Sequence, residues 1–188
     1  MNPITHFLIS WDSAALAGAA KRDRLLITLA GVLPDLDALG IVADVSFPSK
    51  YAWYYYHQYH HQLTHNISAA VVGALAALLL AKRKLFTALM CLGVFHLHLL
   101  CDLVGARGPR AVDIWTVPYL VPFSSVELSW SGQWPLDGWQ NLVITVIMIA
   151  LVFIIAREKG FSPLEIFSVR ADKLFVKSVN DYKSNVRK

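Results

Sequence analysis

Residues 85–104 read LFTALMCLGVFHLHLLCDLV, a run of twenty residues with no Lys, Arg or Glu and a single Asp. At 1.5 Å per residue, a helix of this length crosses the ~30 Å hydrocarbon layer of a bilayer. Two other apolar runs, at residues 67–81 and 139–156, have the same character. These stretches predict membrane-spanning helices and therefore an all-α membrane protein.

The composition of the whole chain agrees with this prediction. Of its 188 residues, 56% are hydrophobic and 16% are charged, and the mean hydropathy is +0.48. Soluble domains have roughly 45–50% apolar and about 25% charged residues. The two cysteines both lie in residues 85–104, which leaves neither a disulfide framework nor a cysteine zinc site. The composition excludes a free soluble domain and a disordered chain.

Two weaker apolar segments, at residues 6–20 and 25–45, precede these runs. The first contains Asp12, and the second is interrupted by the sequence LPDLD at residues 33–37. We expect both to cross the membrane, which gives a polytopic protein of about five helical segments; the alternative is a buried hairpin of two core helices. The start of the chain lacks the basic region of a signal peptide, so we expect the first segment to be retained.

Basic residues are concentrated in alternate connections between these segments. Of the 17 Lys and Arg residues, 14 lie between the first two segments, between the third and fourth, or after residue 156. The positive-inside rule assigns these regions to the cytoplasm. We therefore predict a multi-pass protein of the plasma (inner) membrane, with its N-terminus outside and a membrane-embedded domain at residues 1–156. Residues 157–188 then form a basic cytoplasmic tail with an amphipathic helix.

The basic tail does not require a nucleic-acid partner. Anionic lipid headgroups attract such segments, and a cytoplasmic protein partner would fit the same charge. We expect no nucleic-acid binding.

Ionisable side chains of one chemical kind gather near the outer ends of the segments. Such groups are costly in a membrane and usually functional. Imidazole and carboxylate suit zinc, with manganese and iron as alternatives, and a carboxylate can bridge two ions. We predict that one, two or more divalent ions are bound there by His6, Asp35, Asp37, His60, His65, His98 and Asp102.

The spacing within this set adds detail. His98 and Asp102 are four residues apart and share one face of a helix, whereas His96 points away from them and is predicted either to support a metal ligand or to have a structural role. Asp35 and Asp37 would diverge on a regular helix. The proline that precedes them, at position 34, predicts a break that turns both carboxylates inward, to bind or bridge metal or to act as a general base.

Other polar residues have simpler explanations. A lone membrane histidine more often forms a hydrogen bond between helices than binds metal, and this is our first interpretation of His57 and His61. For Asp12 we expect an interhelical hydrogen bond or a contact with a metal-binding histidine. Carboxylates gathered on one side disfavour a transporter. The sequence has no Gly-rich phosphate loop, GxSxG or HExxH motif, which disfavours the chemistry of serine hydrolases and zincins.

The order of the motifs, an early His followed by LPDLD, HHQLTHN and HLLCDL, resembles the membrane-bound metal-dependent hydrolases. This group is also described as LexA-binding inner-membrane-associated hydrolases, and its pattern has LPDxD, H-R-G-x-T-H-S and H-x-x-x-D followed by Gly. The resemblance covers roughly the first 140 residues. His61 stands where the pattern has Arg, Gln62 where it has Gly, and Asn66 where it has Ser. Loss of the Arg removes a cation that could hold a phosphate, a role that His61 can take over.

The resemblance also implies a reaction. That family is similar to zinc-dependent phospholipase C and P1 nuclease, which are all-helical and have clustered His and Asp metal ligands. It implies hydrolysis of a phosphoester in a membrane lipid or lipid-like substrate, with Asp35, Asp37 and His61 as catalytic residues. The alternative is a non-catalytic membrane protein with a structural metal site or a regulatory surface.

Overall fold

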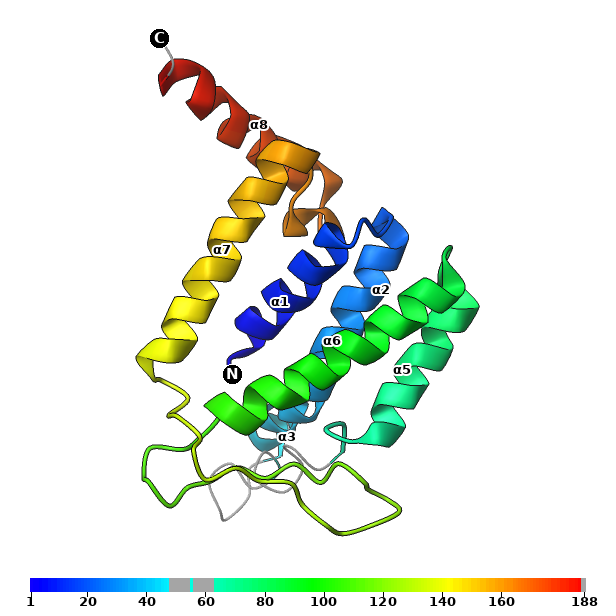
Figure 1. Cartoon of the computed structure of the whole chain (residues 1–188), viewed down its shortest axis with the longest axis vertical. Helices are drawn as coiled ribbons and strands as arrows, with labels where there is room; N and C mark the ends of the chain where they lie inside the picture. Colours follow the sequence, from blue (N-terminus) through cyan, green and yellow to red (C-terminus); the bar gives the residue numbers. More distant parts are fainter. Residues whose placement is uncertain (48–54, 56–62, 187–188) are drawn as a thin grey trace.

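The computed structural model describes residues 1–47, 55 and 63–186, and these residues form helices joined by loops, with two isolated β-bridges and no strand (Figure 1). The prediction of an all-α protein is confirmed for this part of the chain. In chain order the helices are α1 (Pro3–Leu16), α2 (Lys21–Val32), η1 (Pro34–Leu39), α3 (Gly40–Ser46), α5 (Ile67–Leu80), α6 (Lys84–Gly105), α7 (Trp139–Lys159), η2 (Pro163–Ile166) and α8 (Val169–Val186).

Local sequence explains where several of these helices begin and end. The side chains of Asn2 and Asn66 accept hydrogen bonds from backbone N–H groups in the first turns of α1 and α5, as N-cap residues do. Helix α7 ends at Lys159 and is followed by Gly160, whose φ of 74° is favourable for glycine. The break predicted at Pro34 is confirmed, because α2 ends at Val32 and η1 starts at the proline.

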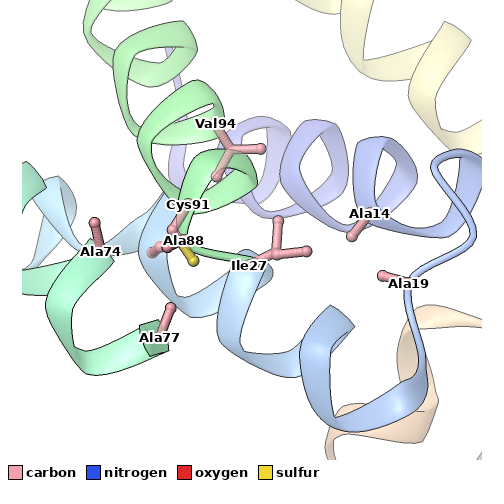
Figure 2. Close-up of a cluster of buried hydrophobic side chains, with 9 residues drawn as sticks. Ala14, Ala19, Ile27, Ala74, Ala77, Ala88, Cys91 and Val94 are labelled. Atoms are coloured by element: carbon pink, nitrogen blue, oxygen red, sulfur yellow. The ribbon is translucent and has the colours of Figure 1, made fainter. Parts of the chain in front are cut away.

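Helix α6 is the centre of the bundle and contacts α1, α2 and α5 (Figure 1). The core between these helices consists mostly of alanine, and in Figure 2 Ala77, Ala88 and Cys91 lie on one side of Ile27 and Ala14 on the other. Small side chains let helix backbones approach closely, which is how helices pack in a membrane. Helix α1 is buried between α2 and α7.

Apolar side chains also cover much of the outer surface. Helix α7 exposes Leu142, Val146 and Ile154, and α5 exposes Val72 and Leu79, each by more than half of its surface. A soluble monomer rarely exposes so much contiguous apolar surface, whereas a lipid-facing helix must. The arrangement of the bundle therefore agrees with a membrane environment.

Only two of the described helices, α6 and α7, are long and apolar enough to cross a membrane individually. Helix α2 and the segment Pro34–Ser46, which bends away from it by 60°, form a third span if they cross the membrane together. Helices α1 and α5 have 14 residues each, or about 21 Å at 1.5 Å per residue. The prediction of about five spanning segments is therefore not supported. The apolar stretches have the predicted positions, but two of the helices are too short.

A buried ion pair joins the segment after α7 to the hairpin of α1 and α2. Arg24 donates to both carboxylate oxygens of Glu165, at 2.7 and 2.8 Å, and its guanidinium lies 3.7 Å from the ring centre of Phe161. The indole of Trp11 donates to the same carboxylate. This end of the bundle, at the top of Figure 1, is thus held together by charge and aromatic contacts.

Candidate metal centre

Four separate segments bring histidines and aspartates together at the end of the bundle that carries the N-terminus. His6 comes from α1, Asp35 and Asp37 from η1, and His65 from the residues just before α5, while His98 and Asp102 lie on α6. Figure 1 shows the N-terminus, the C-terminal half of α6 and the segment that leads to α3 at this lower end. Six of the seven predicted metal ligands are thus gathered in one place.

Asp102 lies at the centre of the cluster. Its Oδ1 is 3.0 Å from Nε2 of His6, and its Oδ2 is 3.1 Å from Nε2 of His98 and 3.4 Å from Nε2 of His65. The backbone nitrogen of Met1 also contacts Oδ1. The carboxylate is buried. Its Oδ1 faces His6 and Met1, and its Oδ2 faces His98 and His65. This is the arrangement of a carboxylate that could bridge two ions.

A hydrogen bond to the backbone of α2 fixes the orientation of the His98 ring. Its Nδ1 donates to the backbone carbonyl of Gly31 at 2.8 Å, which leaves Nε2 directed at Asp102 and, at 3.8 Å, at Asp35. The ring also stacks on that of His6, with 3.6 Å between the ring centres. A hydrogen bond from one imidazole nitrogen sets the tautomer and leaves the other as a metal ligand.

His65 is held in a similar way by a carboxylate. Its Nδ1 is 2.8 Å from Oδ2 of Asp37, and its Nε2 faces Asp102. Burial lowers the pKa of His65, but the hydrogen bonds to Asp102 and Asp37 outweigh it and raise the pKa to about 9. In the metal-free protein this imidazole therefore holds a proton that a bound ion would have to displace.

Two overlapping groups of side chains could hold a metal ion. The first consists of His6, Asp35 and His98, the second of His65, His98 and Asp102, and within each group the ligand atoms lie within 4.8 Å of one another. Buried polar atoms are nearly always paired, yet Nδ1 of His6, Oδ2 of Asp35 and Nε2 of His98 make no hydrogen bond with the described residues. Nitrogen and carboxylate ligands with unused lone pairs fit a divalent ion such as zinc.

The local sequence explains how η1 and the residues before α5 are positioned relative to each other. At the break, the backbone carbonyl of Pro34 accepts a hydrogen bond of 2.6 Å from the hydroxyl of Thr64. This bond ties the residues before α5 to the break, one residue from His65. Asn66, which stands where the hydrolase motif has Ser, caps α5, and Ser and Asn both perform this role well.

Not all predicted residues join the cluster. Asp37 lies outside both ligand groups and contacts His65 instead. His96 points away, as predicted, and its ring nitrogens contact the carbonyl of Leu92 and the hydroxyl of Tyr119. The predictions for His57, His60 and His61 fall outside the described residues.

The prediction for Asp12 is wrong. Both carboxylate oxygens are buried and make no hydrogen bond within the described part of the chain, so the expected interhelical bond is missing there. The apolar surroundings of α1, which packs between α2 and α7, offer the carboxylate little to bind.

Sequence reasoning missed the contribution of Gly31. A Cβ at this position would collide with the side chain of Ser10, so the glycine permits the close approach of α1 and α2 that brings its carbonyl to His98. A glycine inside an otherwise regular helix is the available signal, but it indicates close packing and not the partner of the carbonyl.

Comparison with known proteins gives a family but no relative of known activity. The model of a family described as YdjM inner membrane protein matches residues 1–174. No curated protein and no solved structure matches the chain. The family description names a membrane and no reaction, so the resemblance to the metal-dependent hydrolases stays a prediction.

Proposed function

The chain belongs to the YdjM inner membrane protein family, and we propose that this membrane protein is a metal-dependent hydrolase that cleaves a phosphoester bond in a lipid or lipid-like substrate. One observation carries the proposal: the buried carboxylate of Asp102 is surrounded by three imidazoles, and among the described residues Nδ1 of His6 and Oδ2 of Asp35 have no hydrogen-bond partner. Ionisable groups inside a membrane protein are functional by default, because their burial is costly.

The side chains have distinct roles in this proposal. His6, His65, His98 and Asp102 hold the ion or ions, while Asp37 orients His65 through its hydrogen bond. A divalent ion supplies Lewis acidity and an activated water when bound.

Asp35 has the most exposed side chain of the cluster, at 15% against 5% or less for the others. We therefore assign it the substrate-facing position, where a carboxylate can bind metal or accept the proton of the attacking water.

Apolar surroundings favour a lipid-like substrate. An apolar pocket of about 210 Å³ lies next to His96 and Tyr119, on the face of α6 beside the one that carries His98 and Asp102, and is lined mostly by Leu99, Leu103, Val117 and Leu128. Such a pocket suits a hydrocarbon chain and not a sugar or a nucleotide.

The distribution of charge suggests which way the centre faces. The start of α2, the α5–α6 connection and the end of α7, which carry described basic residues, lie at the end of the bundle opposite the cluster (Figure 1). Under the positive-inside rule, we infer that the cluster opens to the extracytoplasmic side of the inner membrane and that the tail is cytoplasmic. Labelling of single cysteines placed in residues 106–138 with a membrane-impermeant reagent tests this orientation in intact cells.

Metal analysis and activity screening test the proposed reaction. Detergent-purified protein is expected to hold one or two equivalents of a transition metal and to release phosphate or a phosphorylated headgroup from phospholipids or isoprenoid phosphates. His98→Ala and Asp102→Asn should lose metal and activity. His96→Gln is the matched control for metal content, because His96 lies on the same helix and bonds to Tyr119 outside the cluster; it is no control for activity, since His96 lines the apolar pocket.

Two results would contradict the proposal. Protein without tightly bound metal, combined with a His98→Ala variant that behaves like the wild type, would remove the metal centre. Bound metal with a closed shell of four protein ligands, and no turnover of any phosphoester, would instead support a structural site.

A further inference from the structure

A second polar feature lies at the opposite end of the bundle from the metal centre. A pocket of about 550 Å³ opens between the start of α2, the connection from α5 to α6, and the junction of η2 with α8. Along α6, His98 is 14 residues from Lys84, or about 21 Å at 1.5 Å per residue. The pocket is therefore separate from the metal cluster, and its interpretation does not depend on hydrolysis.

Three cations from two segments line this pocket: Lys21, Arg22 and Lys82. All three are exposed, and the described residues supply no ion pair to any of them. The acidic side chain in the lining, Glu165, is already paired with Arg24 through two hydrogen bonds. The pocket thus presents three uncompensated positive charges.

Backbone hydrogen bonds hold the two segments that carry these cations next to each other. The buried carboxylate of Asp23 accepts hydrogen bonds from the backbone N–H groups of Lys82, at 2.8 Å, and Arg83, at 3.1 Å. This contact joins the first turn of α2 to the α5–α6 connection, and so it places Lys82 beside Lys21 and Arg22. Like charges held together this way favour binding of an anion.

The other wall of the pocket is apolar. Ile166, Phe167 and Val169 line it, and the side chains of Phe167 and Val169 are 74% and 52% exposed. The pocket lies at the same end as the last turn of α7, where the apolar helix ends in Arg157 and Lys159. Cations next to exposed apolar side chains are typical of a protein surface at the headgroup level of a membrane.

We propose that this pocket binds the phosphate of an anionic phospholipid headgroup, with Lys21, Arg22 and Lys82 contacting the phosphate and Phe167 contacting the acyl region. Charge complementarity argues for an anionic ligand, and the exposed apolar wall at the end of a membrane helix argues for a lipid as its source. The bound lipid would fix η2 and α8 against the membrane surface.

Competition binding tests the proposal with the full-length chain in neutral detergent. Fluorescent phosphatidylglycerol is titrated until binding saturates, and unlabelled phosphatidylglycerol, phosphatidylcholine or inorganic phosphate is then added. We expect phosphatidylglycerol to displace the probe at a concentration at least about tenfold lower than either of the others. The triple variant Lys21→Gln, Arg22→Gln, Lys82→Gln should lower the affinity by about tenfold or more.

A second triple variant controls for general loss of charge. Arg170→Gln, Lys173→Gln and Lys177→Gln remove the same number of positive charges from exposed positions of α8 that do not line the pocket. We expect this variant to bind phosphatidylglycerol within about twofold of the wild type. An unchanged thermal midpoint and metal content in both triple variants shows that the fold is intact.

Three outcomes would overturn the proposal. Equal loss of affinity in both triple variants would mean that diffuse surface charge binds the lipid. Displacement by inorganic phosphate as effective as that by phosphatidylglycerol would identify a site for a soluble anion. Equal competition by phosphatidylcholine, or binding that never saturates, would mean that the headgroup charge is not recognised.

Discussion

Asp37 provides a test of how the metal centre is built, because its two possible roles predict different losses of metal affinity. Its Oδ2 lies 2.8 Å from Nδ1 of His65, and both side chains are buried. Asp37→Asn keeps the shape of the side chain and a hydrogen-bond acceptor for Nδ1, but it removes the negative charge that makes the imidazole a stronger ligand.

The size of the expected effect follows from this contact. Removal of the carboxylate behind a metal-binding histidine typically weakens metal affinity by about 10- to 100-fold, which corresponds to about 1.4–2.8 kcal/mol of binding free energy. Removal of a direct ligand costs more, so Asp102→Asn should leave no tightly bound metal. Asp37→Asn should therefore still bind metal, with an affinity between those of the wild type and Asp102→Asn.

Competition with a chelator of known affinity measures the difference. Metal retained by each variant is determined by elemental analysis after equilibration, and His96→Gln serves as the control outside the cluster. An unchanged affinity in Asp37→Asn would show that the contact with His65 does not support metal binding. Complete loss of metal, as in Asp102→Asn, would show that Asp37 is itself a ligand.

Three more measurements probe the metal centre and its supports. His65 has a pKa of about 9 and must lose its proton to bind an ion, so metal affinity should rise about tenfold per pH unit from neutral pH to about 9. Calorimetry of metal binding in buffers of different ionisation enthalpy should detect about one released proton. Arg24→Met leaves the buried carboxylate of Glu165 without its cation and should cost about 3–5 kcal/mol of stability in thermal unfolding, whereas Arg24→Met with Glu165→Leu should recover most of it. Gly31→Ala should destabilise the protein by about 1–3 kcal/mol through its collision with Ser10, and the added substitution Ser10→Gly should restore the thermal midpoint.

The positions of the apolar helices could be predicted from the sequence, but their lengths could not. The runs at 85–104 and 139–156 coincide with α6 (Lys84–Gly105) and α7 (Trp139–Lys159). The run at 6–20 was too long at its C-terminal end, because α1 ends at Leu16 and Gly18 adopts a φ of 68° in the turn that follows. Small residues such as the AGAA of this turn are equally common in membrane helices and in tight connections, so hydropathy does not separate the two.

The convergence of the site residues at one end of the bundle could be predicted, because it depends on the topology of the helices. The individual contacts between these residues could not, because they depend on the local conformation of the backbone. Asp35 and Asp37 are equivalent in the sequence, but η1 directs one towards His98 and the other towards His65. A break at proline predicts that the carboxylates leave the helix surface and not which partner each finds. The support of His98 by the carbonyl of Gly31 involves a backbone atom of another helix, so no side chain at that position could indicate it.

The metal centre also links function to the fold, because its ligands come from separate elements of the bundle. Asp102 on α6 contacts His6 of α1, and His98 of the same helix faces Asp35 of η1. Without an ion, these buried groups carry the cost of desolvation and lack part of its compensation, since several of their atoms make no hydrogen bond with any residue that the structure describes. An ion that satisfies them holds the three elements together, and its binding free energy becomes part of the folding free energy. Loss of activity in a ligand variant therefore combines lost chemistry with loosened packing, and variants such as Asp37→Asn, which keep the metal at reduced affinity, are the ones that separate the two.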